Sequence, residues 1–231
     1  MLHLAGLTAA VTTPLGALAG GISLREVPPE HQLDEPRFEL PLAGGATPRQ
    51  QAATVAAIGR LLDAHLPADD PLCGYGRDLA ARASTLPLRG YLTGAIDLLL
   101  RVEVTGEPRY LVIDHKSNRL GPRDRAPTVA DYRPRALATA MRAGHYPLQS
   151  LLYQVAVHRL LRWRLPGYDP DRHLGGSLYL FLRGMAGPDT PHLDGGPCGV
   201  FAWRPPAALV LATSDLLDRG AIADDQAGGR P

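Results

Sequence analysis

The chain has 231 residues, a formal net charge of +1 and two cysteines. This length is enough for one domain with a substantial core. The near-zero charge predicts that any nucleic-acid-binding surface is local. Two cysteines are too few for a disulfide scaffold, a Cys-rich zinc site or a four-cysteine iron–sulfur cluster, and they fit a reducing cytoplasm. No apolar run is long enough to span a membrane, and no signal-peptide pattern is found at the start.

Nucleotide-driven work is not expected of this sequence. The phosphate-binding motif G-x-x-x-x-G-K-[ST] needs a lysine, and the only lysine, Lys116, is not in such a run. Any ATP-dependent step would therefore lie on another chain or in a segment outside this sequence. The sequence also has no internal repeat.

The first 88 residues predict short helices and one strand. Periodicity favours a helix over residues 2–11, a loop over 20–32, a strand over 37–42 and a short helix or turn over 77–84. A longer helix is predicted to open with Thr47 as N-cap and Pro48 at its first position. Its apolar stripe consists of Val55, Ile58, Leu61, Leu62 and Leu66. Asp69 and Asp70 are interpreted as a solvated turn rather than metal ligands.

The stretch 94–121 carries the most chemical information. Two apolar runs flank Thr105-Gly106, which is a hairpin turn signal. In a symmetric hairpin Asp97 lies directly opposite Asp114, with Cβ atoms about 4.5–5.5 Å apart. Lys116 follows on the same face, two residues past Asp114. The opposite face is predicted to be apolar, with Ile96, Leu98, Leu100, Leu111 and Ile113.

Two ionised carboxylates at this distance repel each other unless something offsets the charge. A divalent cation such as Mg²⁺ suits them, because it takes one or two carboxylates and keeps several waters. A neighbouring lysine can orient the attacking water and stabilise charge on a phosphate. The alternative is a surface hairpin with an ordinary ion pair. Lys116 is the only lysine against 23 arginines, which favours a specific role for a compact ammonium; the alternative is chance, since one lysine must fall somewhere.

The segment after the hairpin is basic and then helical. It contains Arg119, Arg123, Arg125, Arg133, Arg135 and Arg142, with Asp124 and Asp131 as its only acids. This cluster is either a phosphate-binding surface or a solvated loop and helix face. Helices are predicted near 134–141 and over 146–165, the second with Leu148, Leu151, Leu152, Val155, Leu160 and Leu161 on its core face. His158 is interpreted as a helix-face residue rather than a ligand.

The last third predicts a buried strand over 177–182, a loop over 188–197, a strand over 199–203 and a helix over 206–217. Arg183 is interpreted as structural, with a phosphate contact as the alternative. The composition from 220 onwards predicts disorder.

Several motifs together resemble a known family. The run G-x-I-D-L followed by I-D-x-K-S-N-x-L-G is similar to the C-terminal nuclease domain of RecB. RecB is the beta subunit of exodeoxyribonuclease V (RecBCD), and this domain belongs to the PD-(D/E)XK class. Gln149 and Tyr153 match the family's Q-x-x-x-Y motif, and the strand end at 181–185 resembles its "YLFLRG" run. The resemblance extends from about 7 to 217.

The resemblance implies an α/β fold: a restriction-endonuclease-like core in which a central mixed sheet carries the catalytic hairpin and helices flank it. The nuclease domain would span 1–219 and a disordered tail 220–231. It implies Mg²⁺-dependent DNA hydrolysis, with Mn²⁺ as a substitute, in double-strand-break repair and recombination. DNA, RecC- and RecD-like subunits and the recombinase RecA are the implied partners, in the cytoplasm.

The resemblance also assigns residue roles. Asp97 and Asp114 would bind the metal, with the backbone carbonyl of His115 as a further ligand, and Lys116 would act on the water. The supporting residues would be Gln149, Tyr153, Ser117 and Asn118. The family has an aromatic residue at the position of His115, whose side chain is expected to point away from the metal.

One departure from the family bears on activity. The family carries a metal-binding histidine upstream, in a run G-T-x-x-H-x-x-x-E that this sequence lacks. We therefore expect an N-terminally incomplete domain with weak or absent activity, restored by the upstream segment or partner subunits. The rival hypothesis is a catalytically deficient module that docks RecA or partner subunits. A metal phosphatase is a third, more distant alternative.

Overall fold

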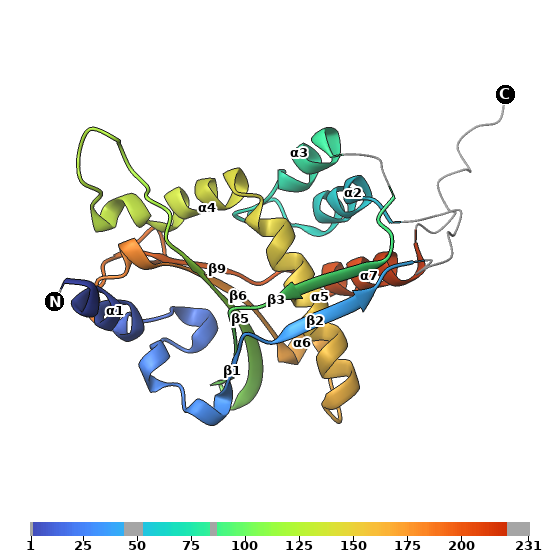
Figure 1. The fold of residues 1–231 in the computed structure, drawn as a ribbon, viewed down its shortest axis with the longest axis horizontal. Coiled ribbons are helices and arrows are strands. Elements are labelled where there is room, and N and C mark those ends of the chain that lie inside the picture. Colours follow the sequence, from blue (N-terminus) through green and yellow to red (C-terminus); the bar gives the residue numbers. More distant parts are fainter. Residues whose placement is uncertain (1, 44–52, 84–86, 221–231) are drawn as a thin grey trace.

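The fold is built around a mixed sheet. A computed structural model describes residues 2–43, 53–83 and 87–220 (Figure 1). The sheet has five strands in the order β1-β4-β5-β6-β9. These are β1 (Gln32–Asp34), β4 (Leu98–Val104), β5 (Glu107–Lys116), β6 (Leu174–Phe181) and β9 (Val200–Trp203). Strands β5 and β6 run parallel and the other neighbours run antiparallel. The predicted α/β class with a mixed sheet is confirmed.

The predicted hairpin register is confirmed from Leu98 onwards. The ladder pairs Leu98 with Ile113 and ends with Val104 opposite Glu107. Both turn residues, Thr105 and Gly106, have positive φ (54° and 78°). Consecutive positive φ values twist the turn in the direction that the two strands require.

The start of the hairpin differs from the prediction. Residues 94–95 belong to a separate strand, β3 (Tyr91–Ala95), which pairs with β2 (Arg37–Pro41). The chain bends between β3 and β4, so the alternation of side chains is interrupted. Ile96 therefore packs in a different core cluster from Leu98, and its predicted place on the same face is wrong.

Both faces of the sheet are buried. On one face lie α2 (Val55–His65), α3 (Tyr75–Arg82), α4 (Pro134–Ala143), α5 (Tyr146–Arg164) and α7 (Ala207–Arg219). On the other lie α1 (Leu2–Thr12) and the turns that follow it, as Figure 1 shows. Leu99 and Val112 are buried under the helical layer, on the face predicted to carry the two acids and the lysine. This face is therefore largely apolar and buried, and the two acids and the lysine lie at one end of its strands.

Two helices differ in detail from the prediction. Helix α2 begins at Val55, where Thr54 caps it by accepting a 3.0 Å hydrogen bond from the Ala57 amide. The predicted start at Thr47-Pro48 lies outside the described residues. In α5 most of the predicted stripe faces the core, but Leu160 is 37% exposed and its predicted burial is wrong.

The remaining elements are short. They comprise α6 (Pro170–His173), β7 (His192–Leu193), β8 (Gly196–Pro197), and the 3₁₀ helices Ala17–Ala19, Leu24–Glu26, Pro29–His31, Val129–Tyr132 and Leu182–Gly184. The predicted loop 188–197 thus contains a small hairpin of β7 and β8. The predicted disordered tail, apart from Gly220, lies outside the described residues. Within the described part of the chain, no helix has the length and apolar character needed to cross a membrane.

Candidate active site

Asp114 is a buried acid on the central strand of the sheet. Its side chain is on β5 and the residue is 2% exposed. The Lys116 Nζ lies 2.6 Å from Asp114 Oδ2. This is a close ion pair with the Lys116 ammonium, and no further donor among the described residues reaches this oxygen. A buried carboxylate whose one close partner is an ammonium is a candidate for a ligand-binding or catalytic role.

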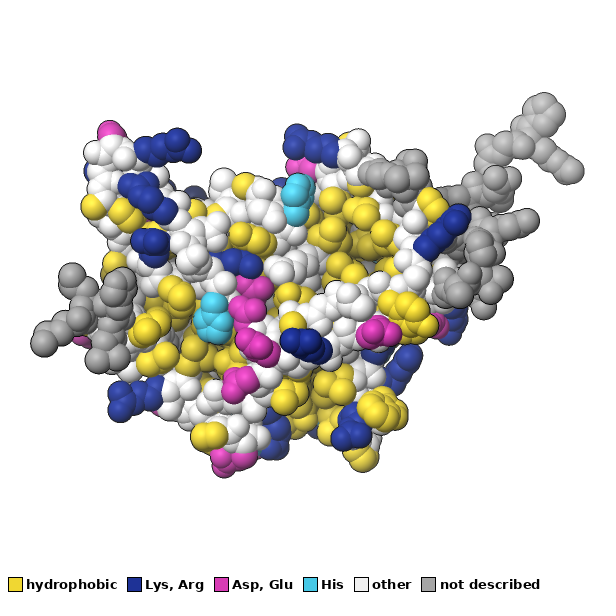
Figure 2. Space-filling model, in the orientation of Figure 1, with side chains coloured by type: hydrophobic (Ala, Val, Ile, Leu, Met, Phe, Trp, Pro, Cys, Tyr) yellow, Lys and Arg dark blue, Asp and Glu magenta, His cyan; other side chains and the backbone are white. Residues whose placement is uncertain are grey.

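Asp97 lies at the chain bend immediately before β4, next to the Leu98–Ile113 pair. It is exposed, and its Oδ2 accepts a 2.8 Å hydrogen bond from the His115 backbone amide. Asp97 and Asp114 therefore meet at the same end of the hairpin, as the turn symmetry predicts. Figure 2 shows acidic side chains gathered on this face of the molecule.

The His115 side chain is not where it was expected. Its Nδ1 lies 3.4 Å from Asp97 Oδ2, so the ring contacts an acid of the candidate site instead of pointing away from it. The physical reason is the bend at Asp97, which turns that carboxylate across the end of β5. The prediction that this side chain lies away from the site is wrong.

Burial raises the pKa of the Asp114 carboxyl above its ordinary value. The charge of Asp97 raises this pKa further, while Lys116 lowers it. Both raising effects would be offset by a nearby cation. The electrostatics of the two acids therefore suit a positively charged ligand.

The donor set suits Mg²⁺ or Mn²⁺ rather than a metal held by several side chains. In residues 2–43, 53–83 and 87–220, no group of three or more His, Cys, Asp or Glu side chains is arranged to hold a metal ion. Mg²⁺ keeps several waters and uses one or two carboxylates. The carboxylates of Asp97 and Asp114, which meet at one end of the hairpin, match that requirement.

Lys116 is enclosed by aromatic rings. Its Nζ lies 4.1 Å from the centroid of the Tyr146 ring and 5.2 Å from that of Tyr179. Tyr146 is the first residue of α5, and Tyr179 pairs with Asp114 across the parallel strands β5 and β6. Neither tyrosine was predicted from the sequence. The available signal was the position of Tyr146, three residues before Gln149 and thus on the same side of the helix.

Gln149 and Tyr153 reach the site through Tyr179. The Gln149 side-chain amide donates to Tyr153 Oη at 3.0 Å, and Tyr179 Oη donates to Gln149 Oε1 at 3.1 Å. Burial raises the pKa of Tyr153, and the Asp114 charge acts in the same direction. Burial raises the pKa of Tyr179 as well, so the phenols of Tyr153 and Tyr179 stay protonated at neutral pH. The structure thus brings the predicted Gln–Tyr pair close to Asp114 and Lys116.

Ser117 and Asn118 form the segment that leaves the site. The Ser117 carbonyl accepts a 2.9 Å hydrogen bond from Arg183 Nε, in line with a structural role for Arg183. Asn118 donates to Tyr146 Oη at 3.4 Å, and its carbonyl accepts from Tyr132 Oη at 3.2 Å. These contacts hold the chain at the end of β5 in place.

Most of the arginine cluster is engaged with the protein itself. Arg125 pairs with Asp131 at 2.7 Å, and Arg119 donates to the carbonyls of Pro122 and Arg125. Arg142 donates to the carbonyls of Pro71 and Cys73, and Arg133 and Arg135 lie within 4.0 Å of Asp194. These internal partners favour the structural alternative over a dedicated phosphate surface.

Other candidate residues have structural partners. The His158 Nδ1 lies 2.9 Å from Tyr168 Oη, and the His173 ring contacts the backbone of Asp169. Asp70 accepts hydrogen bonds from the Leu72 amide and from the Trp203 indole. The predictions that His158 and Asp70 are not ligands agree with these contacts.

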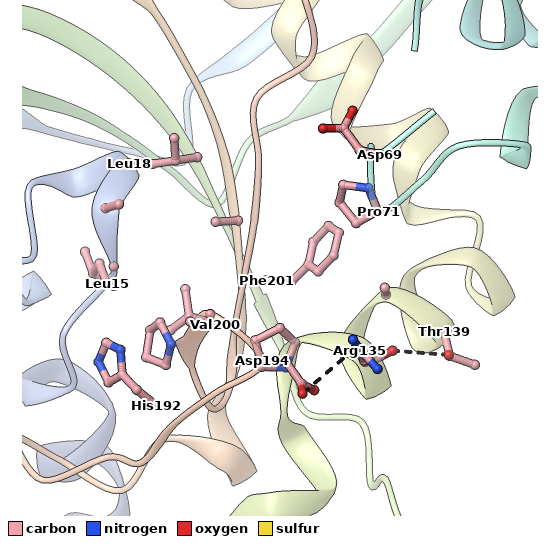
Figure 3. A pocket seen from close by; sticks show the side chains of 18 of the residues that line it. Leu15, Leu18, Asp69, Pro71, Arg135, Thr139, His192, Asp194, Val200 and Phe201 are labelled. Atoms are coloured by element: carbon pink, nitrogen blue, oxygen red, sulfur yellow. Dashed lines mark hydrogen bonds and ion pairs between the residues drawn. The ribbon is translucent and has the colours of Figure 1, made fainter. Parts of the chain in front are cut away.

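A large cavity lies away from the acids. It has a volume of about 800 Å³ and opens beside β9, between the turn at Leu15–Leu18 and helix α4 (Figure 3). Its charged lining residues include Arg135 and Asp194, which face each other. Asp97, Asp114 and Lys116 do not line it. The chemistry of the site therefore belongs to the strand ends and not to this cavity.

Fold and site together define an α/β protein whose central hairpin places two carboxylates and a lysine at the ends of its strands. No protein-family model matches the chain. The chain is 51% identical to "RecBCD enzyme subunit RecB" of Mycolicibacterium smegmatis over 207 residues, 89% of this chain and 19% of that protein. With the protein of the same name from Mycobacterium tuberculosis (strain CDC 1551 / Oshkosh) it shares 51% over 212 residues, 91% of this chain and 19% of the relative.

A more distant relative agrees. The RecB subunit of Escherichia coli (strain K12) is 34% identical over 210 residues, which cover 91% of this chain and 15% of that protein. The chain is therefore homologous to one portion of RecB subunits, and it spans about a fifth or less of the length of these relatives.

Proposed function

We propose that this chain hydrolyses DNA phosphodiester bonds in a metal-dependent reaction, as the nuclease portion of a RecBCD-type helicase–nuclease in double-strand-break repair and recombination. The observation that carries the proposal is the buried Asp114, whose Oδ2 lies 2.6 Å from the Lys116 ammonium and has no further donor among the described residues. Homology to RecB subunits supports the biological setting. A restriction-endonuclease-like core is part of the same proposal.

Each residue of the site has a separate role in the proposed reaction. Asp97 and Asp114 would hold Mg²⁺ or Mn²⁺, with the carbonyl of His115 as a further ligand. When bound, the cation would supply Lewis-acid activation of a water and of the phosphate. The Lys116 ammonium would orient that water and stabilise negative charge as it develops on the phosphate. Gln149 and Tyr153 would support the site indirectly, through the hydrogen bond between Gln149 and Tyr179.

The proposal extends to partners. DNA would be the substrate, and RecC- and RecD-like subunits would complete the assembly, because the relatives are subunits of a RecBCD enzyme by name. RecA docking and a cytoplasmic location, both expected from the sequence, stay predictions.

A cleavage assay tests the proposal. Single-stranded DNA is incubated with Mg²⁺, with Mn²⁺ or with EDTA, using the 231-residue chain alone and within a complete RecB-type complex. Cleavage that needs the metal and is lost in Asp114→Asn supports the proposal. Cleavage by the complex that is unchanged in Asp114→Asn would overturn it. Metal binding without cleavage in either setting would favour the docking alternative.

A further inference from the structure

We propose that Tyr146 and Tyr179 form an aromatic seat that positions Lys116 beside Asp114, and that Gln149 acts by holding this seat rather than by contacting a metal. The geometry of the seat stands by itself. Its catalytic meaning rests on the proposed function, in which Lys116 acts on the attacking water.

The seat is defined by two rings and one carboxylate around a single ammonium. The Lys116 Nζ lies 4.1 Å from the Tyr146 centroid, 5.2 Å from the Tyr179 centroid and 2.6 Å from Asp114 Oδ2. The two rings stack on each other, with centroids 5.8 Å apart and an angle of 26° between their planes. A cation within about 6 Å of an aromatic centroid is attracted by the ring's electron-rich face.

The lysine side chain needs such a seat because it is flexible. Its four-carbon stem has many rotamers, and an isolated ion pair fixes the ammonium poorly. Here the Lys116 side chain is only 14% exposed. Misplacing a catalytic group by about 1 Å can cost about 10²-fold in rate. Two aromatic rings and one carboxylate next to the ammonium restrict its position more than the ion pair alone.

The seat is itself held by hydrogen bonds. Tyr179 is fully buried on β6, and its hydroxyl donates to Gln149 Oε1 at 3.1 Å and contacts the Tyr146 carbonyl at 3.3 Å. The Tyr146 hydroxyl receives a 3.4 Å hydrogen bond from Asn118. Gln149 also donates to Tyr153. The Gln–Tyr pair of α5 therefore acts on Lys116 through Tyr179, which makes Gln149 a positioning residue.

The seat also explains why one lysine persists among 23 arginines. An ammonium is a compact point charge, whereas a guanidinium is a planar fork that needs room for bidentate contacts. The space between the Tyr146 ring and Asp114 fits the compact group.

The seat can be tested by NMR because Lys116 is the only lysine in the chain. With isotope-labelled lysine the metal-free protein gives one set of side-chain signals. Ring currents from Tyr146 and Tyr179 should move the ε-methylene protons upfield of free lysine. Tyr146→Leu should lose most of this shift, and Tyr146→Phe, which keeps the ring, should retain it. Tyr91→Leu is the matched control, because Tyr91 is 60% exposed on β3.

The outcomes are distinct. An ε-methylene signal at the position of free lysine, or one equally shifted in Tyr146→Leu, would overturn the seat. Melting curves check that each variant folds, and Tyr146→Met replaces Tyr146→Leu if the latter does not.

Kinetics give the catalytic part of the test. In the complex that cleaves DNA, Tyr146→Leu should lower kcat by about 10- to 100-fold with KM and metal affinity unchanged, and Tyr146→Phe should restore most of the loss. Equal kcat values in wild type and Tyr146→Leu would overturn the positioning role. A wild-type complex without nuclease activity would refute the proposed function, while the NMR result would still decide whether the seat exists.

Discussion

Asp114 is an ionisable group kept where water cannot stabilise its charge. The raised pKa of its carboxyl is the direct consequence of burial, and the neighbouring Asp97 adds to it. A buried carboxyl with a shifted pKa, a second acid and a lysine beside it is typical of functional sites. The residue-scale predictions therefore concern what Asp114 and Lys116 bind and do.

The first prediction concerns metal binding. Mg²⁺ or Mn²⁺ should raise the melting temperature of the wild-type chain, because a ligand that binds only the folded state stabilises it by mass action. At a metal concentration 100 times the Kd the gain is about 2.7 kcal/mol. Differential scanning fluorimetry with and without EDTA measures it, and Asp114→Asn should remove the gain. A wild-type melting temperature indifferent to metal would count against the site.

The second prediction separates charge from shape at Lys116. Lys116→Arg keeps the positive charge but should abolish cleavage, because the guanidinium fork does not fit beside the water. Titration calorimetry should show that metal binding survives. Arg60→Lys, on the solvent side of α2, is the control for arginine–lysine exchange elsewhere in the chain. Full activity in Lys116→Arg would make the lysine dispensable.

At the residue scale, the part of the site that lies within one hairpin could be predicted from the sequence. The opposition of Asp97 and Asp114 followed from the turn, because an antiparallel register is fixed once the turn residues are known. Tyr146 and Tyr179 could not be placed the same way, since their approach joins a helix to a strand 33 residues later. The position of the His115 ring depended on a bend at Asp97 that no periodicity shows.

At the scale of elements, the crossing of α2 and α3 depends on two glycines. A Cβ added at Gly76 would lie 2.4 Å from the Gly59 carbonyl oxygen and 2.5 Å from the Asp63 amide nitrogen. Both contacts are with backbone atoms of α2, which cannot rotate away. The helices pack this closely only because the side chains are missing at this point.

The third prediction follows from this crossing. Gly76→Ala should destabilise the protein by about 1–3 kcal/mol, because overpacking forces the two helices apart. Urea denaturation measures the change. Gly6→Ala in α1 is the control, since a Cβ there has no atom within 4 Å and alanine favours a helix. A Gly76→Ala variant as stable as Gly6→Ala would show that the crossing is looser than described.

The fourth prediction concerns the turn Val129–Tyr132. The Arg125 guanidinium, together with the Thr128 amide, holds the pKa of the Asp131 carboxyl far below its usual range. A depressed pKa in the folded state means that the stabilisation is present at neutral pH and is lost as the pH falls through the folded-state pKa. The turn should therefore keep its structure in moderate acid.

NMR can follow this titration at the Thr128 amide, which donates to Asp131 Oδ2 at 2.7 Å. Its chemical shift should titrate well below about pH 3.9, the ordinary value for aspartate. Arg125→Gln should move the midpoint upwards. A midpoint near the ordinary value in the wild-type protein would contradict the ion pair.

Regular elements were predictable because hydrophobic periodicity is local. Helix α5 and the two long hairpin strands follow this rule. The pairing of β2 with β3 was not predictable, since about fifty residues separate the two strands. Gly94 is the residue that lets β2 and β3 pair this closely, because a Cβ there would lie 2.6 Å from the Phe38 ring. The predicted burial of Leu160 was wrong because an apolar residue on a helix does not always lie on the packed side.

At the scale of the whole molecule, charge is nearly balanced and most arginines of the basic segment bind the protein itself. The fifth prediction is therefore a shallow salt dependence for single-stranded DNA binding. Each neutralised phosphate contributes a slope of about −0.7 to log K against log salt concentration on single strands. Because most arginines of the basic segment have internal partners in the part of the chain that the structure describes, the total slope should be shallower than about −3. Fluorescence anisotropy over a salt series measures it, and a steeper slope would mean that the internal arginine contacts open on binding.

Strand β5 has a hydrogen-bonded neighbour on each side, β4 and β6, and lies third in a five-stranded sheet. Its amides should exchange with solvent only through global unfolding, because no local opening can free them. We therefore expect the strand that carries Asp114 and Lys116 to be among the slowest-exchanging parts of the molecule. Switching this site on and off by fraying its own strand would require unfolding the sheet. In the proposed reaction, control over cutting would then come from outside the strand, through what is allowed to approach the exposed carboxylate of Asp97.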